Sequence, residues 1–543
     1  MLGNQFDDDL VLRSYLARVV PIKTLHEFEV SLRDMGQLAG NELYHMQLAD
    51  RLNEPLLTQW DAWGNRIDRI DLTPLWHYAE ELAVENGLVA TAYEQKHGHL
   101  SRVHQCALAY LFTPSTDFYS CPLAMTDGAA RTLLTSGNQT LIERALPHLI
   151  TRNPDDFWTA GQWMTELTGG SDVSSSETVA KRVEGTDKFR LYGRKWFTSA
   201  VNSNIALTLA RPQGNPAGGA GLALFYVETR DRYERLRNIE VNRLKDKLGT
   251  RKLPTAELSL NGTPAELVKG MTDGVRNIAP LLNITRLWNG ITAVSLMRRG
   301  LALAADYAKK RTVFGALLSE KPLYKDTLAG LHAEFSAAFQ LTFLIVELTG
   351  RNETGELDDK GRLLLRVLTP VMKLLTAKQA VFVASEIVES FGGAGYVEDT
   401  GLPVLLRDSQ VLPIWEGTTD VLALDTLRAL GSGTNSADKF SILKETFTVE
   451  LATISYPQLA HAALVSSTAL SHAIGWYSKA ATKGRDALET GARRFAMTVG
   501  RAIELALLIK HAEWSRNNEG NMNSVHSAIR FSRSTIDCIV DDD

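Results

Sequence analysis

The stretch Ala256-Glu257-Leu258-Ser259-Leu260 decides the fold class of this 543-residue chain. Its apolar residues occupy every second position, and this alternation is typical of a β-strand; Leu222, Leu224 and Tyr226 have the same spacing. The pattern extends over about residues 155–265, with turn signals at Gly214-Asn215-Pro216 and at Asn261-Gly262. The sequence therefore predicts a β domain in the middle of the chain.

Helical periodicity lies on both sides of this β domain. Apolar residues recur every three or four positions over about residues 25–150 and again over about 270–430. The loop Gly431–Ser436 has the composition of a hinge, and helical spacing resumes after it. We therefore predict an α+β fold in four parts: an N-terminal helical domain at 1–154, a β domain at 155–268, a helical-bundle domain at 269–431 and an appended helical domain at 432–543.

Composition narrows the class of protein. A net charge of -5 argues against a surface built for nucleic acid or anionic membrane. The three cysteines form no Cys-x-x-Cys pair, which favours a reducing compartment without structural zinc. The longest apolar stretches, such as 503–509, are far shorter than the roughly 20 residues that span a bilayer. The acidic opening Asp7–Asp9 conflicts with a leader peptide, so we expect a cytoplasmic protein, or a mitochondrial one if residue 1 is not the natural start.

Common nucleotide and metal motifs are absent from the sequence. There is no Gly-x-x-x-x-Gly-Lys-Ser/Thr loop and no strand-anchored Gly-x-Gly-x-x-Gly. His97, His99 and His104 lie near one another but lack the His-Glu-x-x-His arrangement, so a solvated helix face explains them better than a metal site. We expect no bound metal.

Four separated segments carry residue types suited to a flat polar ring and a phosphate: close glycines, hydroxyls, an aromatic side chain and a guanidinium. They are Met164–Asp172, Lys195–Ser199, Arg311–Gly315, and Phe391–Tyr396 followed by Trp415–Thr418. Taken singly, each has a simpler explanation as a surface turn, an ordinary strand or a helix end. Their order along the chain is more informative than any one of them.

This ordered set resembles the acyl-CoA dehydrogenase family over about residues 60–430. The resemblance implies an N-terminal helical domain, a β domain and a C-terminal four-helix bundle, with FAD as cofactor and acyl-CoA as substrate. It also implies a homotetramer, built as a dimer of dimers with FAD at a subunit interface, and an electron acceptor such as an electron-transfer flavoprotein or oxygen. A closer likeness to the adaptive-response, AidB-like branch is suggested by Trp60–Arg66, Arg243–Arg251 and the appended helical domain.

The resemblance assigns FAD contacts residue by residue. Phe197 would cover the flavin ring, and a neighbouring hydroxyl would reach its edge. Counting from Lys195 places Ser199 at that position, whereas counting back from Arg211 places Thr198 there, so both stay candidates. The remaining members of the predicted FAD set are Met164 and Thr165 at the ring, Ser171 near the ring and the CoA phosphates, Arg311 and Phe314 at a neighbouring subunit's pyrophosphate, Gly392 and Gly393 at the adenine dinucleotide portion, and Trp415, Thr418 and Asp420.

Glu416 is the predicted catalytic base. Pro413 and Gly417 bracket a tight turn, and Trp415 would shield the carboxylate from water, which would raise its pKa towards the range useful for a base. In the family, such a carboxylate removes the α-proton of an acyl thioester while the β-hydride leaves for flavin N5. Some relatives carry their base on an earlier helix, but the matching stretch 283–286 has no carboxylate here. The predicted substrate contacts are Ser171, Asn283, Arg286, Glu416 and Gly417.

Three functions are compatible with these residues. The first is an FAD-dependent dehydrogenase of medium- or long-chain acyl-CoA, and the second is a flavoprotein that sequesters acyl-CoA or fatty acyl ligands with little turnover. The third is an AidB-like flavoprotein associated with DNA through the appended domain. Residues 432–543 contain 12 Lys and Arg against 12 Asp and Glu, so their net charge is zero, which is poor support for phosphate binding.

Overall fold

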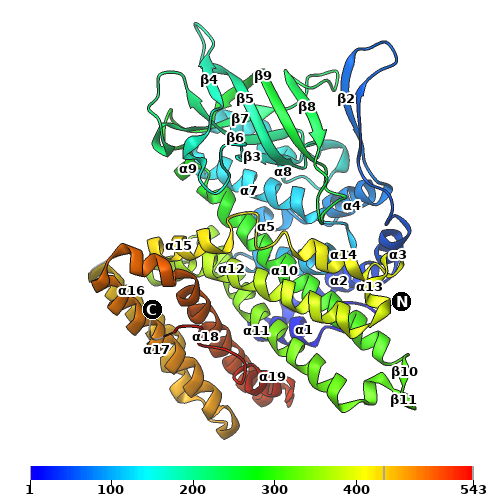
Figure 1. Cartoon of the computed structure of the whole chain (residues 1–543), viewed down its shortest axis with the longest axis vertical. Helices are drawn as coiled ribbons and strands as arrows, with labels where there is room; N and C mark the ends of the chain where they lie inside the picture. Colours follow the sequence, from blue (N-terminus) through cyan, green and yellow to red (C-terminus); the bar gives the residue numbers. More distant parts are fainter. Residues whose placement is uncertain (1, 432–433, 541–543) are drawn as a thin grey trace. The chain divides into compact units, whose positions relative to one another are not determined.

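The computed structural model describes residues 2–431 and 434–540 (Figure 1). The predicted hinge at 431–436 and the predicted domain boundary at 432 therefore fall partly outside the described residues, and the four-part division stays a prediction. Contacts group the chain into two compact units. Unit 1 comprises Met1–Glu42, Gln95–Pro114 and Asn289–Asp543, and unit 2 comprises Leu43–Glu94 and Ser115–Trp288. The N-terminal helical region is thus divided between the two units.

Unit 1 is built from helices and one short hairpin. Its helices are α1 (Leu10–Val19), α2 (Ile22–Gly40), α6 (Leu100–Phe112), the larger part of α10 (Ala279–Ala308), α11 (Pro322–Glu353), α12 (Asp359–Ser390), α13 (Gly393–Tyr396), α14 (Leu402–Ser409), α15 (Thr419–Leu430), α16 (Thr434–Lys444), α17 (Ala460–Lys483), α18 (Arg485–Glu519) and α19 (Asn523–Phe531). The hairpin is β10 (Thr312–Val313) with β11 (Ala316–Leu317). In the appended region, α18 packs against α11, α12 and α15 of the bundle.

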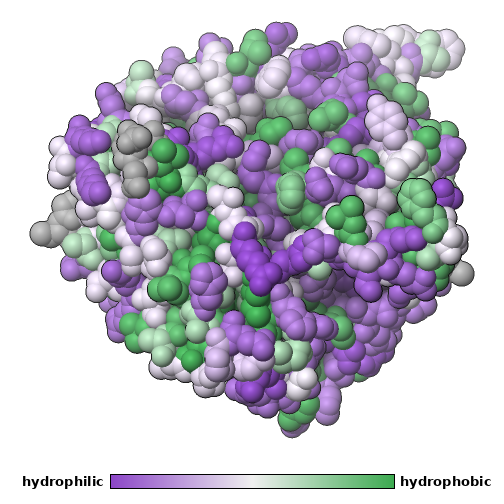
Figure 2. All heavy atoms as spheres, turned by 60° about the horizontal axis from the view of Figure 1, so that its bottom comes forward, coloured by the Kyte–Doolittle hydropathy of each residue, from purple (hydrophilic) through white to green (hydrophobic). Residues whose placement is uncertain are grey.

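Two of these helices, α11 and α12, are long and apolar enough to cross a membrane by length and composition alone. In their most apolar stretches, however, 72% and 83% of the residues are buried inside the protein. On the face in Figure 2, hydrophobic and hydrophilic atoms are interspersed. The apolar character of α11 and α12 is explained by their central place in the bundle.

Unit 2 contains the predicted β domain. Its seven-stranded sheet consists of β3 (Ala160–Trp163), β4 (Val179–Arg182), β5 (Lys188–Ser199), β6 (Ile205–Pro212), β7 (Ala223–Glu228), β8 (Ile239–Leu244) and β9 (Thr255–Leu267). Strand pairing runs from β6 through β4, β5, β9 and β7 and returns to β6, while β3 pairs with β6 and β8 with β9. Strands β5 and β9 alternate in burial, as their sequences do, whereas β7 is buried on both faces and its residues pack into two hydrophobic clusters.

The predicted turn at Asn261-Gly262 is a bulge instead. Strand β9 runs straight through it, pairing Asn261 with Tyr192 and Thr263 with Leu191 and leaving Gly262 unpaired. Gly262 adopts φ +89°, which an L-residue rarely takes. The predicted turn between strands at this position is therefore wrong.

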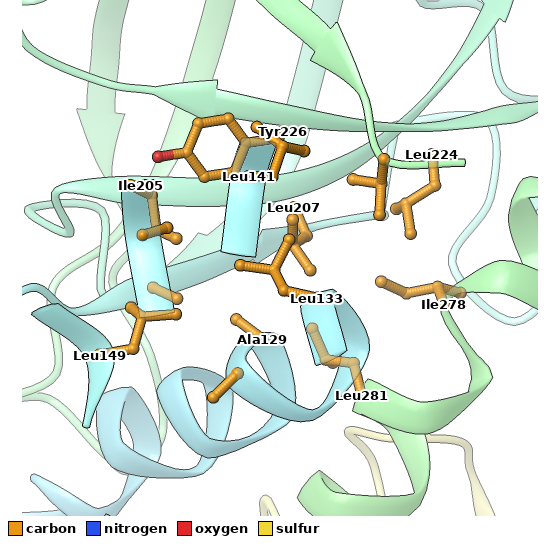
Figure 3. Packing of buried hydrophobic residues seen from close by; sticks show 14 of the residues in the cluster. Ala129, Leu133, Leu141, Leu149, Ile205, Leu207, Leu224, Tyr226, Ile278 and Leu281 are labelled. Atoms are coloured by element: carbon orange, nitrogen blue, oxygen red, sulfur yellow. The ribbon is translucent and has the colours of Figure 1, made fainter. Parts of the chain in front are cut away.

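The helices of unit 2 are α3 (Glu42–Ala49, of which Glu42 belongs to unit 1), α4 (Pro74–Glu85), α5 (Ala90–Glu94), α7 (Ser120–Ser136), α8 (Gln139–Leu149) and α9 (Gly274–Asn277). Helices α7 and α8 cover one face of the sheet, where Leu133 and Leu141 point towards Leu207 and Tyr226 (Figure 3). Ile278 closes the same cluster. This packing fixes the sheet on which one part of the candidate site is built.

The region predicted as wholly helical also contains a hairpin, β1 (Leu56–Trp60) with β2 (Arg66–Asp71). Arg66 donates a hydrogen bond to Val241 O at 2.9 Å, and Asp68 accepts one from Val241 N at 2.9 Å. The hairpin thereby joins β8, just before the Arg243–Arg251 stretch. Two stretches that suggested the AidB-like likeness therefore lie together in unit 2.

Candidate functional site

In unit 2, the predicted flavin-ring residues lie on β5 and on the loop that follows β3. Trp196 N donates to Thr165 O at 2.9 Å, which ties the Met164–Thr165 segment to the strand. Met164, Thr165 and Phe197 are half-buried, and Ser171 is exposed farther along the loop. The structure thus brings the first two predicted segments together.

A buried ion pair between Lys195 and Glu166 links β5 to the loop that follows β3. Lys195 Nζ lies 2.7 Å from Glu166 Oε1, and the side chains are 0% and 3% exposed. Lys195 Nζ also donates to Leu209 O at 2.8 Å, while Thr178 donates to Glu166 through its hydroxyl at 2.6 Å. Burial opposes ionisation of Glu166, but the Lys195 ammonium and these hydrogen bonds outweigh it, so the pKa of Glu166 is lowered. The carboxylate is therefore ionised and locked in place.

The structure separates the two hydroxyl candidates by their surroundings. Thr198 is fully buried, and its hydroxyl donates to Ala256 O of β9 at 2.7 Å. Ser199 is half-buried, and its hydroxyl lies 3.1 Å from the Thr255 hydroxyl. Phe197 and Ser199 are both half-buried, whereas Thr198 between them is buried, so Ser199 is the more accessible of the two hydroxyls.

Asn283 and Arg286 lie on the part of α10 that belongs to unit 2. They are three residues apart and so lie on the same side of the helix. Asn283 is exposed and Arg286 is half-buried, which leaves both side chains partly accessible to a ligand.

Arg311 and Phe314 lie on the β10–β11 hairpin in unit 1. We had placed Arg311 at the end of a helix, but α10 ends at Ala308 and Arg311 begins the hairpin instead. Phe314 is 98% exposed at the hairpin tip and has a left-handed φ of +47°. The Arg311 guanidinium is exposed, and none of the described residues holds it in an ion pair. Both side chains are therefore accessible from outside the chain.

Gly392 and Gly393 follow the end of α12. Gly392 adopts φ +59° and forms the N-cap of α13, and a Cβ atom added at either glycine would meet no atom within 4 Å. The open space over both residues permits close approach of a ligand or of another chain.

Glu416 lies in the turn between α14 and α15, in unit 1. Its backbone is left-handed, with φ +58°, and Gly417 follows at φ +100°. A left-handed non-glycine residue costs on the order of 1–3 kcal/mol and persists where its surroundings hold it. The Trp415 indole N–H donates to Asn289 Oδ1 on α10, which holds one side of the turn.

Lys373 holds the turn from the other side. This side chain on α12 is buried, and its Nζ donates to Trp415 O at 2.6 Å and to Gly417 O at 2.7 Å. Sequence analysis identified neither Lys373 nor Asn289, because both lie far from Glu416 along the chain. The one available signal was a lysine in an otherwise apolar stretch of α12, where a charged residue needs a specific partner.

The last two predicted cofactor residues begin α15. Thr418 is its N-cap and accepts a hydrogen bond from Val421 N at 3.4 Å. Asp420 is exposed, and its Oδ1 lies 3.3 Å from an Arg493 nitrogen on α18. The segment after Glu416 is therefore joined to the appended helices.

Within residues 2–431 and 434–540, no group of three or more His, Cys, Asp or Glu side chains is arranged to hold a metal ion. His104, one of the three clustered histidines, stacks on Phe28 at 4.1 Å and lies 2.8 Å from the Ser31 hydroxyl. These two contacts explain the place of His104 without a metal ion.

Family models match nearly the whole chain. Their descriptions are the adaptive response protein AidB N-terminal domain at 2–156, the acyl-CoA dehydrogenase middle domain at 161–263, the acyl-CoA dehydrogenase C-terminal domain at 272–431 and the acyl-CoA dehydrogenase 11 C-terminal domain-like model at 440–542. The resemblance and the α+β fold class drawn from the sequence are confirmed.

Individual proteins agree with these models. Acyl-CoA dehydrogenase family member 11 of Caenorhabditis elegans is 40% identical over 544 residues, covering 98% of this chain and 87% of that protein. The putative acyl-CoA dehydrogenase AidB of Escherichia coli is 31% identical, covering 77% and 76%. The crystal structure of Caenorhabditis elegans ACDH-11 in complex with C11-CoA superposes with a TM-score of 0.95 at 39% identity, covering 99% of this chain and 92% of that one.

Proposed function

Because the chain belongs to the acyl-CoA dehydrogenase family, in its AidB-like branch, we propose that it is an FAD-dependent dehydrogenase of medium- or long-chain acyl-CoA with Glu416 as the base. The observation that carries this proposal is the turn at Glu416. A strained carboxylate-bearing residue is held by Lys373 on one helix and by Asn289 on another. Strain of this kind is found at functional sites.

The protein's own residues would perform the proton transfer. The Glu416 carboxylate would take the α-proton, and the backbone N–H of the same residue would donate to the thioester carbonyl and stabilise the charge that develops there. Asn283 and Arg286 would position the ligand along α10. The relative crystallised with C11-CoA supports an acyl-CoA of this length range.

The residues fit FAD by their chemistry. On unit 2, Phe197 offers an aromatic face, and of the two candidate hydroxyls the half-buried one of Ser199 is the more accessible for a hydrogen bond to the ring edge. On unit 1, Arg311 offers a guanidinium fork for a diphosphate, and Phe314 lies beside it. Bound FAD would accept the β-hydride at its N5 atom.

The exposed residues of unit 1 would also contribute to a homotetramer. The exposed Arg311–Phe314 tip and the open Gly392–Gly393 surface would bind FAD of a neighbouring subunit in a homotetramer. An electron-transfer flavoprotein or oxygen would then reoxidise the flavin. DNA association is not part of the proposal, because residues 432–543 carry no net charge.

The proposal is tested by anaerobic titration of the purified protein with acyl-CoAs of increasing chain length. The protein should be yellow with bound FAD, and medium or long chains should bleach its visible absorption. A colourless protein that cannot be reconstituted with FAD contradicts the cofactor assignment. Tight acyl-CoA binding without bleaching at any length contradicts turnover and favours sequestration.

A further inference from the structure

Lys373 connects α12 to the turn that carries Glu416, 43 residues further along the chain. Its ammonium has three N–H groups, and two of them donate to the carbonyl oxygens of Trp415 and Gly417, the residues before and after Glu416. Both hydrogen bonds have donor–acceptor distances of 2.6–2.7 Å, in the range of charge-assisted bonds. One side chain therefore binds the 415–416 and 417–418 peptide units, which enclose Glu416 and Gly417.

This arrangement determines the backbone conformation of Glu416. Glu416 and Gly417 have consecutive positive φ angles of +58° and +100°, and in this conformation the carbonyls of Trp415 and Gly417 both accept from Lys373 Nζ. Gly417 adopts its angle without steric cost, whereas Glu416 does not. Without the ammonium, the carbonyls of Trp415 and Gly417 lose a charged donor that holds the turn around the left-handed Glu416.

We propose that Lys373 is a positioning residue that holds the Glu416 carboxylate and the Glu416 N–H in their reactive geometry. This inference rests on the proposed function, since it assigns the means by which the proposed base is oriented. Lys373 acts through the backbone and not on the substrate. A displacement of about 1 Å in a catalytic group costs on the order of 100-fold in rate. Loss of the two Lys373 hydrogen bonds, which we call the carbonyl clamp, should therefore reduce the rate of proton abstraction by about that factor.

The test compares Lys373→Met with Lys378→Met. Methionine matches the length of the lysine stem, and Lys378 lies on the same helix, is half-buried and forms no ion pair among the described residues. In anaerobic stopped-flow mixing with a medium-chain acyl-CoA, Lys373→Met should lower the limiting rate of flavin bleaching about 100-fold while FAD content and acyl-CoA affinity stay within about threefold. Lys378→Met should match the wild type. The double variant with Glu416→Gln should be no slower than Glu416→Gln alone, because Lys373 acts through Glu416.

A readout without turnover separates this inference from the proposed function. Amide hydrogen exchange in a peptide covering 411–418 should be faster in Lys373→Met and unchanged in Lys378→Met, whether or not the wild type is bleached by any acyl-CoA. Bleaching failure in the wild type contradicts the proposed function alone. Unchanged exchange together with a wild-type bleaching rate in Lys373→Met overturns the inference. If that variant does not fold, Lys373→Gln takes its place, and a wild-type exchange rate there overturns the inference equally.

Discussion

Each unit contains a buried lysine that contacts residues next to predicted site residues, but the two lysines bind different partners. In unit 2, Lys195 pairs with the carboxylate of Glu166 and so links the loop after β3 to the sheet. In unit 1, Lys373 donates to two backbone carbonyls and so fixes the conformation of one turn. The ion pair fixes the place of a segment, whereas the carbonyl clamp fixes the backbone angles of one residue.

This difference has consequences for mutation. A broken ion pair leaves an uncompensated charge in the interior, so damage at Lys195 should be measured first as lost stability. Without the carbonyl clamp, the strained backbone at Glu416 can relax, so substitution of Lys373 should reduce the rate of flavin bleaching more than the stability of the protein. Four predictions, ordered from the largest expected effect to the smallest, test this contrast.

Lys195→Met should destabilise the protein by about 3–5 kcal/mol, because Glu166 would remain buried without its partner. The measurement is thermal unfolding together with FAD content after gel filtration. The double variant Glu166→Gln/Lys195→Met should recover part of the loss, since it buries no unpaired charge. An unfolding temperature equal to that of the wild type in Lys195→Met would show that the ion pair does not support unit 2.

The pH dependence of stability should have opposite signs at two buried glutamates. The pKa of Glu166 is lowered, so its stabilising contribution is present above its ordinary value of 4.5 and is lost as the pH falls through the folded value. Burial raises the pKa of Glu504 on α18 well above 4.5, and Gln379 donates to it at 3.0 Å. Its contribution is present below 4.5 and is lost as the pH rises through that raised value.

Glu504→Gln should therefore gain unfolding temperature relative to the wild type as the pH is raised from 4.5 to 8. Glu166→Gln should instead have a constant deficit in unfolding temperature relative to the wild type above pH 4.5, and this deficit should shrink as the pH falls below 4.5. Two parallel differences would contradict the assignment of opposite charge states.

Thr198→Ala and Ser199→Ala should separate stability from cofactor binding. Thr198→Ala removes a buried hydrogen bond to Ala256 O and should cost about 1–3 kcal/mol. Ser199→Ala should leave the unfolding temperature of the FAD-free protein unchanged and weaken FAD binding several-fold, as measured by fluorescence titration. The reverse pattern would move the flavin contact to Thr198.

Phe314→Ala should have the smallest effect on the stability of the single chain, because the ring is 98% exposed. A change of less than about 0.5 kcal/mol is expected for a surface substitution. Weaker self-association, measured by analytical ultracentrifugation, should accompany it. Unchanged association would remove this hairpin from the proposed subunit interface.

The sequence was informative where function is encoded in a contiguous stretch. Two-residue spacing of apolar side chains identified the segments of β5, β7 and β9, and the run from Lys195 to Ser199 lies within β5. It could not show that Asn261-Gly262 is a bulge, because a bulge and a turn both need a positive φ and only the strand register distinguishes them. It missed the β1–β2 hairpin, which is held by contacts to β8 about 175 residues away.

The surroundings of Glu416 were also beyond the sequence. Trp415 was recognised from its position next to Glu416, but its partner Asn289 and the clamp by Lys373 arise from helices that converge only in the folded chain. The hydroxyls of Thr198 and Ser199 both bond to β9, and only their different burial in the folded chain distinguishes the two candidates. The sequence predicted candidate residues within contiguous segments, but it could not predict hydrogen bonds between residues far apart in the chain.

The most direct test of the central claim is single-turnover reduction of the FAD-loaded protein by acyl-CoA carrying deuterium at the α-carbon. The wild type should bleach more slowly with the deuterated than with the protiated substrate, and Glu416→Gln should bind both while bleaching 100-fold more slowly or worse, on the order of the loss of a general base. The control variant Glu386→Gln on α12 should match the wild type. A Glu416→Gln protein that bleaches within about threefold of the wild-type rate would contradict the assignment of Glu416 as the base.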